Sequence, residues 1–286
     1  MNLVLSTVLT AALASVGPHF SSRRVDLQAL GNFASPVMGF DHYRMNGPIF
    51  SPHPHAGFSA VSYVFENSAG GLRNRDSLRH DLVIEPGAMV WTQAGSGVVH
   101  DEFPARVGHE VHGVQIFVNL PREKKDLPPQ MLHLGTADVP VVVDTDGNRT
   151  RVLSGCFSGA VSPVKPAEPF DLLDVTVTGT WRFRVPTRRN VLVYVLSGAV
   201  DIAAGGEVRQ VQAFQAVAGR ASKAGDLQVK AREASQLLLL SGTDPGEPVA
   251  VYGPFIMNDQ AQLAAAFERY RNGEMGRLSP IAIDAL

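Results

Sequence analysis

The sequence has little of several features that would assign it to a familiar class of protein. One cysteine, Cys156, stands among 286 residues, so the chain cannot form an internal disulfide and its fold does not depend on an oxidising compartment. The 25 Lys and Arg against 27 Asp and Glu give a net charge of -2, without the basic stripe typical of direct nucleic-acid binding. No segment approaches about 18 uninterrupted apolar residues, so we expect no membrane span.

Aromatic residues are also scarce, at 7%, whereas Gly and Pro are plentiful, at 27 and 19 residues. This composition favours many short strands and turns over long helices. Short β-branched or aromatic runs, bounded by turn residues, recur in the first half at Ala60 to Phe65, Met89 to Trp91, Val114 to Val118 and Val141 to Val143. Their spacing is typical of an antiparallel sandwich or barrel.

A second half with the same texture begins near Val152. Val61 to Phe65 and the later Trp91 to Gly95 are weakly similar to Val191 to Leu196 and Phe214 to Gly219, which indicates duplication. We therefore predict two antiparallel β-barrels of similar plan, one in residues 1–145 and one in residues 146–286. Closure of the sheets would remove exposed strand edges.

Three other segments carry separate predictions. The apolar stretch Met1 to Val16 lacks a basic region, so a buried first strand or helix is favoured over a weak export signal, and we expect a cytoplasmic protein. The charged, proline-rich Pro121 to Pro129 is expected to be a solvated loop. One helix is predicted near the C-terminus, capped by Asp259 with Gln262 and stopped at Gly273, covering apolar surface.

Two pairs of potential metal ligands give the sharpest signal. In an extended strand, residues two apart point to the same face, so His53 and His55 converge, as do His100 and Glu102. Facing strands would place three imidazoles and one carboxylate around one point, a set suited to Fe(II), Mn, Ni, Cu or Zn. Two open positions on an octahedral ion would make the site catalytic rather than structural. A lone His-x-His is more often a polar face or loop, and that alternative stays open on spacing alone.

Several segments, in their order along the chain, resemble the pirin family of the cupin superfamily. They are HPHAGFSAVSYVFE (53–66), NRDSL (74–78), IEPGAMVWTQAGSGVVHDE (84–102), HGVQIFVNLP (112–121) and GPFIMN (253–258). The resemblance implies an all-β bicupin, with two barrels packed together and a C-terminal helix. It also implies that the first barrel holds one iron, most simply Fe(II), through His53, His55, His100 and Glu102.

The chain departs from the family pattern in two places. Ala56 and Ser59 stand where family members commonly have Arg and Glu. If Ser59 shares the face of His53 and His55, the pocket beside the metal would be roomier, but a bulge at Gly57 would turn it away. In the second half, we expect the stretch beginning at Arg189 at the position of the His-x-His strand, and because it contains no histidine we expect that barrel to hold no metal.

Three functions follow from the resemblance. Some pirin-like proteins are quercetin 2,3-dioxygenases, which open the central ring of a flavonol with O₂ and release carbon monoxide. On that hypothesis Glu102 is both ligand and catalytic base, with Phe58, Trp91 and Phe117 as apolar neighbours of the substrate. The alternatives are a metal- or redox-sensitive regulator that acts through a protein partner, and a cupin whose metal only stiffens the barrel.

Overall fold

The computed structural model describes residues 3–281, which form two compact units. Unit 1 contains the chain up to Ala12, Arg23–Met38 and Asp138–Asp244, and unit 2 contains Leu13–Ser22, Gly39–Ala137 and the chain from Pro245 onward. Segments at both ends of the chain therefore cross between units. The C-terminal helix belongs to the same unit as His53, His55 and His100, although a boundary near residue 145 would assign it to the other half.

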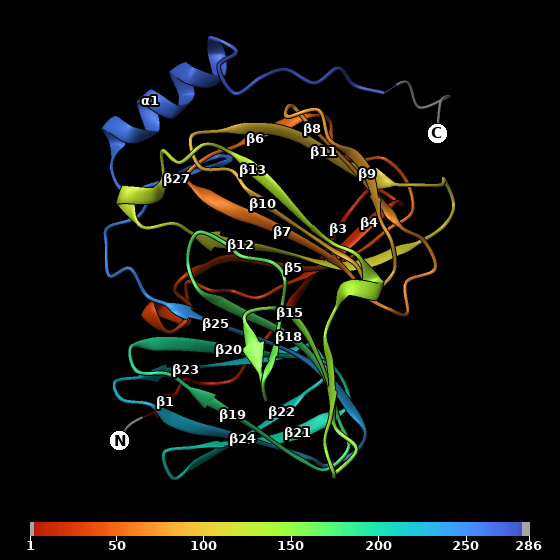
Figure 1. Ribbon diagram of the computed structural model, residues 1–286, viewed down its shortest axis with the longest axis vertical. Coiled ribbons are helices and arrows are strands. Elements are labelled where there is room, and N and C mark those ends of the chain that lie inside the picture. The colour runs from red at the N-terminus through yellow and green to blue at the C-terminus, as the bar shows by residue number, and fades with distance from the viewer. Residues whose placement is uncertain (1–2, 282–286) are drawn as a thin grey trace. The chain divides into compact units, whose positions relative to one another are not determined.

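Unit 2 consists of two antiparallel sheets that face each other (Figure 1). The larger has the order β13(Gln130–Leu134), β10(Met89–Gln93), β7(Phe58–Val64), β12(Val111–Asn119), β5(Val37–Met45), β4(Phe20–Arg24) and β3(Ala12–Val16). The smaller has the order β6(His53–His55), β11(Val98–Pro104), β8(Leu72–Asp76) and β9(Asp81–Ile84). A hairpin of β26(Ala250–Tyr252) and β27(Phe255–Met257) completes the unit.

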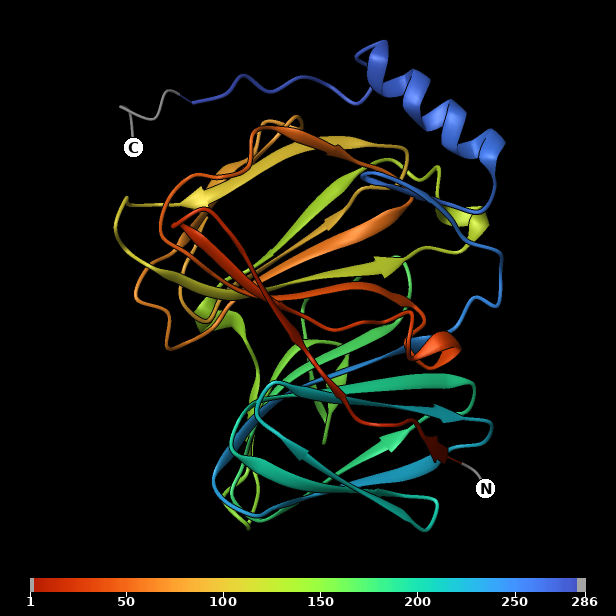
Figure 2. The same ribbon diagram turned by 180° about the vertical axis from the view of Figure 1, so that it is seen from behind.

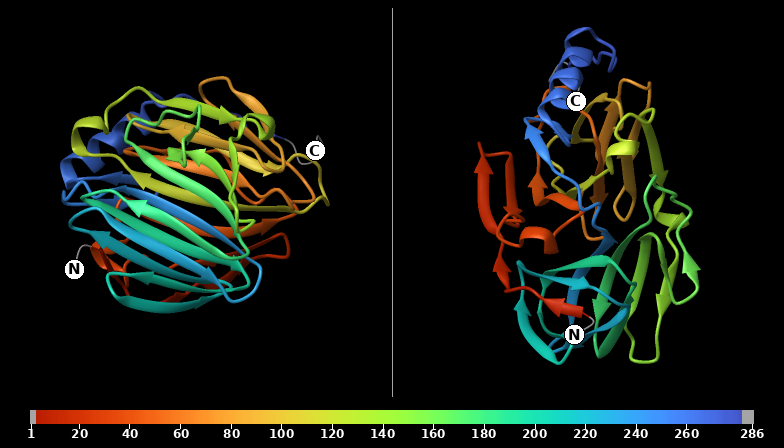
Figure 3. Two further views of the ribbon diagram at one scale, coloured as in Figure 1. Left: turned by 60° about the horizontal axis from the view of Figure 1, so that its bottom comes forward. Right: turned by 90° about the vertical axis from the view of Figure 1, so that its left-hand side faces the viewer.

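Unit 1 has the same two layers, which can be followed in Figure 3. Its larger sheet has the order β1(Leu3–Leu5), β23(Gln215–Ala221), β20(Arg189–Ser197), β25(Ser235–Thr243), β18(Phe170–Val177), β15(Arg149–Ser154) and β14(Val141–Val143), with β2(Leu9–Thr10) also paired to β23. Its smaller sheet has the order β19(Thr180–Val185), β24(Gly225–Ala231), β21(Ala199–Ala204) and β22(Glu207–Gln212). A short hairpin joins β16(Cys156–Phe157) to β17(Ala160–Val161).

The strand order confirms the predicted duplication. The run β6-β11-β8-β9 in unit 2 has its counterpart in β19-β24-β21-β22 of unit 1, and β10-β7-β12-β5 has its counterpart in β23-β20-β25-β18. The strand that corresponds to the His-x-His strand is therefore β19, not the stretch beginning at Arg189, which corresponds to β7. The sheets of each unit are separate layers of a sandwich rather than one closed barrel, and the all-β bicupin prediction is otherwise confirmed.

The predicted helix is α1(Gln260–Arg271), visible beside the β26–β27 hairpin in Figures 1 and 2. The Asp259 side chain accepts a hydrogen bond from the Gln262 amide at 2.9 Å, which satisfies one of the free amides of the first turn. Leu263 and Ala266 pack in an apolar cluster with Ala56 and Phe255, so the helix covers apolar surface as expected. Among residues 3–281, no helix is long and apolar enough to cross a membrane.

The remaining described helices are short 3₁₀ turns at Gly31–Phe33, Arg122–Lys124 and Thr136–Asp138. At the N-terminus, β1 pairs with β23 and buries Leu3 and Leu5 in the core of unit 1, as a first strand was predicted to do. Met1, which opens the stretch considered above, lies outside the described residues.

Candidate metal centre

The register between β6 and β11 brings together the histidines of the two predicted ligand pairs. His53 is paired with His100, and His55 is paired with Val98. Because side chains alternate along a strand, all three imidazoles project from the same face of this small sheet. One ligand nitrogen from each of His53, His55 and His100 lies within 4.8 Å of the others. This clustering matches the geometry that strand alternation predicts.

The three imidazoles differ in whether their nitrogens make hydrogen bonds. Nδ1 of His53 donates to the Ser51 carbonyl at 3.0 Å, which fixes the tautomer and leaves the lone pair of Nε2 directed elsewhere. Both nitrogens of His100 are buried and have no hydrogen-bond partner among residues 3–281. The nitrogens of His55 are also buried and make no hydrogen bond of acceptable geometry there, although the Pro254 carbonyl is near enough to favour its protonated form. Unpartnered buried nitrogens are costly, which is explained if they serve as ligands.

Burial keeps these imidazoles neutral. It lowers the pKa of His55 to about 3, with the charge of His53 as a second cause. Burial also lowers the pKa of His100 well below its ordinary value, reinforced by the other two histidines, and lowers that of His53. Neutral imidazole is the form that binds a metal, and it suits divalent ions such as Zn, Cu, Fe and Ni. The residues present therefore fit a divalent metal.

Glu102 lies two residues after His100 on β11 and points into the same interior, but its carboxylate is not part of the three-histidine cluster. The Ser62 hydroxyl donates to Oε1 at 2.5 Å and the Gln115 amide donates to Oε2 at 3.3 Å. Burial raises the pKa of Glu102 to about 7, and these two hydrogen bonds partly oppose the rise. The carboxyl can therefore gain or lose a proton near neutral pH, and its membership in the ligand set stays a prediction.

Sequence reasoning missed three polar residues of this interior. Ser62 and Gln115 project from β7 and β12 of the opposite sheet, and Asn74 is paired with Glu102 across β8 and β11. Asn74 is fully buried, and neither polar atom of its amide has a partner among the described residues. A polar residue at a position that faces the interior could have indicated each of them. Which positions face the interior is known only once the strands are paired.

Two of the three aromatic residues expected near the metal lie there. The rings of Phe58 and Phe117 are 5.1 Å and 5.4 Å from that of His55, measured between ring centres, and 4.7 Å from each other. Trp91 is paired with Val61, on the opposite face of the larger sheet from Ser62 and Phe58, so it does not border the histidines. The alternation that selects Phe58 and Phe117 also excludes Trp91.

The hypothesis that Ser59 shapes the metal site is wrong. β6 ends at His55, Gly57 adopts φ 84°, and β7 begins at Phe58 in a different sheet. On β7 the inward residues are Phe58 and Ser62, so Ser59 is buried on the opposite face. The other departure, Ala56, packs in the apolar cluster beneath the helix rather than beside the histidines.

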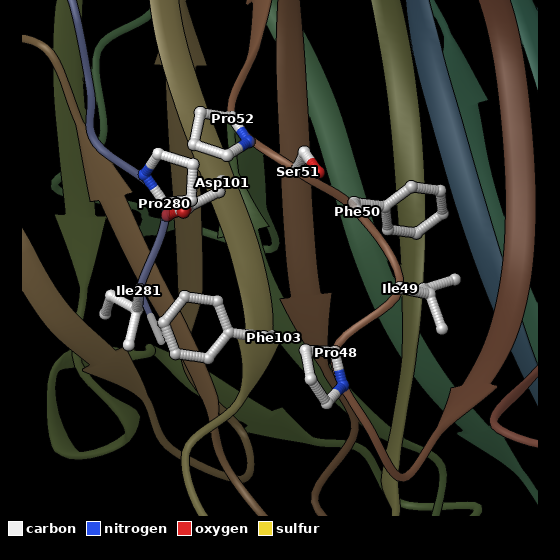
Figure 4. A pocket seen from close by; sticks show the side chains of 9 residues that line it. All are labelled: Pro48, Ile49, Phe50, Ser51, Pro52, Asp101, Phe103, Pro280 and Ile281. Atoms are coloured by element: carbon white, nitrogen blue, oxygen red, sulfur yellow. The ribbon is translucent and has the colours of Figure 1, made fainter. Parts of the chain in front are cut away.

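A pocket of about 270 Å³ lies on the outer face of β11 (Figure 4). Asp101 and Phe103 point into it, away from His100 and Glu102, and the segment Pro48–Pro52 forms its opposite wall. Pro280 and Ile281 close one side. None of the three histidines lines this pocket, although Phe50 on its wall lies 6.3 Å from the His53 ring.

Comparison with known proteins places the chain in a family. Residues 18–118 match the family model described as Pirin, and residues 172–276 match the Pirin C-terminal cupin domain. Pirin-1 of Arabidopsis thaliana is 32% identical over 231 residues, covering 79% of this chain and 78% of that protein. A pirin-like protein of Caulobacter vibrioides is 32% identical over 229 residues, covering 78% and 79%.

A solved structure is similar over nearly the whole chain. The crystal structure of quercetin 2,3-dioxygenase from Acinetobacter baumannii has a TM-score of 0.84 and 26% sequence identity, and the match covers 98% of this chain and 100% of that one. The paired cupin units, the two family models and the sequence relatives agree, and the chain therefore belongs to the pirin family.

Proposed function

We propose that the protein is a metal-dependent dioxygenase that opens the central ring of a flavonol with O₂. The observation that carries the proposal is the cluster of three neutral imidazoles, of which His55 and His100 are buried and have nitrogens without a hydrogen bond of acceptable geometry among the described residues. A divalent metal, for which we propose Fe(II), would be held by His53, His55 and His100, with Glu102 as fourth ligand. The likeness to a protein named quercetin 2,3-dioxygenase supports the choice of substrate.

When bound, the metal would supply a Lewis acid and a redox centre at which the flavonol and O₂ meet. The chain's own residues supply the remainder. Glu102 is suited to take the proton of the flavonol hydroxyl, because its carboxyl is buried in the same interior as the histidines and burial makes it a stronger base in the metal-free protein, where its pKa is raised to about 7. Ser62 and Gln115 hold that carboxylate in place. Phe58 and Phe117 offer apolar faces beside His55 for a flat aromatic ring.

The test begins with elemental analysis of the purified protein and of apoprotein reloaded with Fe(II), Mn(II), Ni(II), Cu(II) or Zn(II). Each loaded form is then given quercetin in an oxygen electrode, and carbon monoxide is measured in the headspace. We expect one metal per chain, and oxygen uptake matched by carbon monoxide. Stoichiometric metal without oxygen uptake in any form would contradict the enzyme and favour the alternative of a regulator that acts through a protein partner.

A further inference from the structure

Lys125 is buried where the sequence predicts a solvated loop. Its segment, Pro121 to Pro129, is charged and proline-rich, yet the Lys125 side chain has 0% of its surface exposed. The ammonium donates to the Gly57 carbonyl at 2.7 Å, to Asn119 Oδ1 at 2.6 Å and to the Ile256 carbonyl at 2.9 Å. An ammonium has three donors, so each one has an acceptor.

The three acceptors come from segments far apart in the sequence. Gly57 follows His55 by two residues, Ile256 lies on β27, and Asn119 ends β12. The backbone adds two more links, from the Ile256 amide to the Ala56 carbonyl at 3.1 Å and from the Gly57 amide to the Gly95 carbonyl at 2.8 Å. The turn that follows the His-x-His strand is therefore hydrogen-bonded to the β26–β27 hairpin and to the turn between β10 and β11.

This turn has little room for adjustment. A Cβ at Gly57 would lie 2.0 Å from the Ile256 carbonyl oxygen, and φ of 84° is unfavourable for any other residue. The Gly57 and Ile256 carbonyls both point at the Lys125 ammonium, which holds two like dipoles close together. Without it, two buried carbonyls would each lose a charged hydrogen-bond donor, which is unfavourable.

We propose that Lys125 is a positioning residue for the metal centre. Its ammonium holds the turn that follows His55 against β27, so that the three imidazoles already converge in the metal-free protein. The proposal rests on the proposed function in so far as the histidines bind a metal. The β26–β27 hairpin thereby becomes part of the metal-binding unit, although it contributes no ligand. Burial lowers the pKa of Lys125 to about 8, so the ammonium form with three donors predominates at neutral pH.

The test compares Lys125→Met with two controls. Lys165→Met removes a lysine that donates to one carbonyl in unit 1. Val111→Ala removes apolar contacts from the cluster in unit 2 that contains Val64 and Leu72. It serves as the stability control, because we expect it to destabilise the unit about as much as Lys125→Met without contacting the Gly57 turn. We would measure the melting temperature of each apoprotein, the Kd for Ni(II) by chelator competition, and the visible spectrum of the Co(II) form.

We expect Lys125→Met to weaken Ni(II) binding about 10- to 100-fold, the range typical of residues that orient metal ligands, and to change the Co(II) spectrum. Val111→Ala should lower the melting temperature by a similar amount and leave the Kd within about twofold of the wild type. Equal Kd values for Lys125→Met and Val111→Ala would overturn the proposal. If Lys125→Met does not fold, Asn119→Ala, which removes one of the three acceptors, should weaken binding in the same direction by a smaller factor.

Hydrogen exchange separates this proposal from the proposed function. In apoprotein, the Gly57 and Ile256 amides should exchange at least about tenfold faster in Lys125→Met than in Val111→Ala, because local opening then requires less free energy. A wild-type protein that binds no metal would end the proposed function, and the exchange measurement alone would then decide whether Lys125 holds the turn. Unchanged exchange at both amides would show that it does not.

Discussion

The two units share one strand plan but line their interiors with opposite chemistry. On β6 and β11 of unit 2 the inward side chains include His53, His55, His100 and Glu102. On the corresponding strands β19 and β24 of unit 1 they are Trp181, Phe183, Val185, Leu227 and Val229, all part of one apolar core. A cupin sandwich therefore folds around either lining, and the strand plan by itself does not call for a metal site.

The difference has an energetic consequence. Unit 1 gains from burying apolar side chains throughout its interior, at about 25 cal/mol per Å². Unit 2 buries imidazole nitrogens that have no hydrogen-bond partner among the described residues, together with an ionisable carboxyl, and both cost stability in the apoprotein. We infer that the polar interior of unit 2 lowers the stability of the apoprotein, and that a bound metal would restore part of that stability.

The largest expected effect comes from removing a ligand on one of two corresponding strands. His100→Ala should abolish stoichiometric metal binding, since the site loses one of its three clustered imidazoles. Leu227→Ala, on the corresponding strand of unit 1, should leave the metal content at the wild-type value and lower the free energy of unfolding by about 2–5 kcal/mol. Elemental analysis and denaturant unfolding check both. Full metal content in His100→Ala would contradict the assignment.

The next effect concerns turnover. Glu102→Gln keeps the size of the side chain and an oxygen atom but removes the basic carboxylate. Flavonol-dependent oxygen uptake should fall about 100-fold or more, as expected on loss of a general base. Oxygen uptake at the wild-type rate in Glu102→Gln would exclude Glu102 as the base.

The polar interior should also make stability depend on pH. His55 and His100 have lowered pKa values, so between about pH 4.5 and 6.5 they stay neutral when folded and take up protons on unfolding, and stability falls as the pH falls. Glu102 acts in the opposite direction, because its folded pKa is raised to about 7 and the folded state holds the extra proton. His53 and His112, whose pKa values are also lowered, act in the same direction as His55 and His100, so the stability of the apoprotein falls overall as the pH falls through this window.

Denaturant unfolding of apoprotein at several pH values in this window measures the slope. Glu102→Gln removes the opposing group and should steepen the slope by about 1.4 kcal/mol per pH unit, the effect of one proton. A flat profile in both proteins would mean that the two histidines are not held neutral by the fold.

The smallest effect distinguishes two serines on one strand. Ser62→Ala removes the hydroxyl that donates to Glu102, so the pKa of Glu102 should rise and the pH profile of activity should move to higher pH, with about a tenfold loss of activity at pH 7. Ser59→Ala, the same change on the opposite face of β7, should leave metal affinity and pH profile within about twofold of the wild type. Equal effects of the two substitutions would contradict the face assignment.

Local sequence pattern predicted that His53, His55 and His100 lie close together. The i, i+2 spacing of His53 and His55, and of His100 and Glu102, specified which side chains share a face, because alternation is a property of any extended strand. It could not specify Ser62, Gln115 or Asn74, since these reach Glu102 from other strands. It left the face of Ser59 open, because whether Gly57 would interrupt the alternation between β6 and β7 could not be read from the residues, and Gly57 does interrupt it, in the left-handed region.

By itself, the sequence determined the all-β class, the duplication, the capped C-terminal helix and the pair of histidine-bearing strands, since composition, turn residues and strand periodicity are local properties. The tertiary structure alone decided which strands face each other, that the last segment of the chain returns to the histidine unit, and that Lys125 is buried. The physical reason is that a charged residue in a proline-rich loop is solvated unless acceptors from elsewhere surround it. Those acceptors, at Gly57, Asn119 and Ile256, are brought together only by the complete fold.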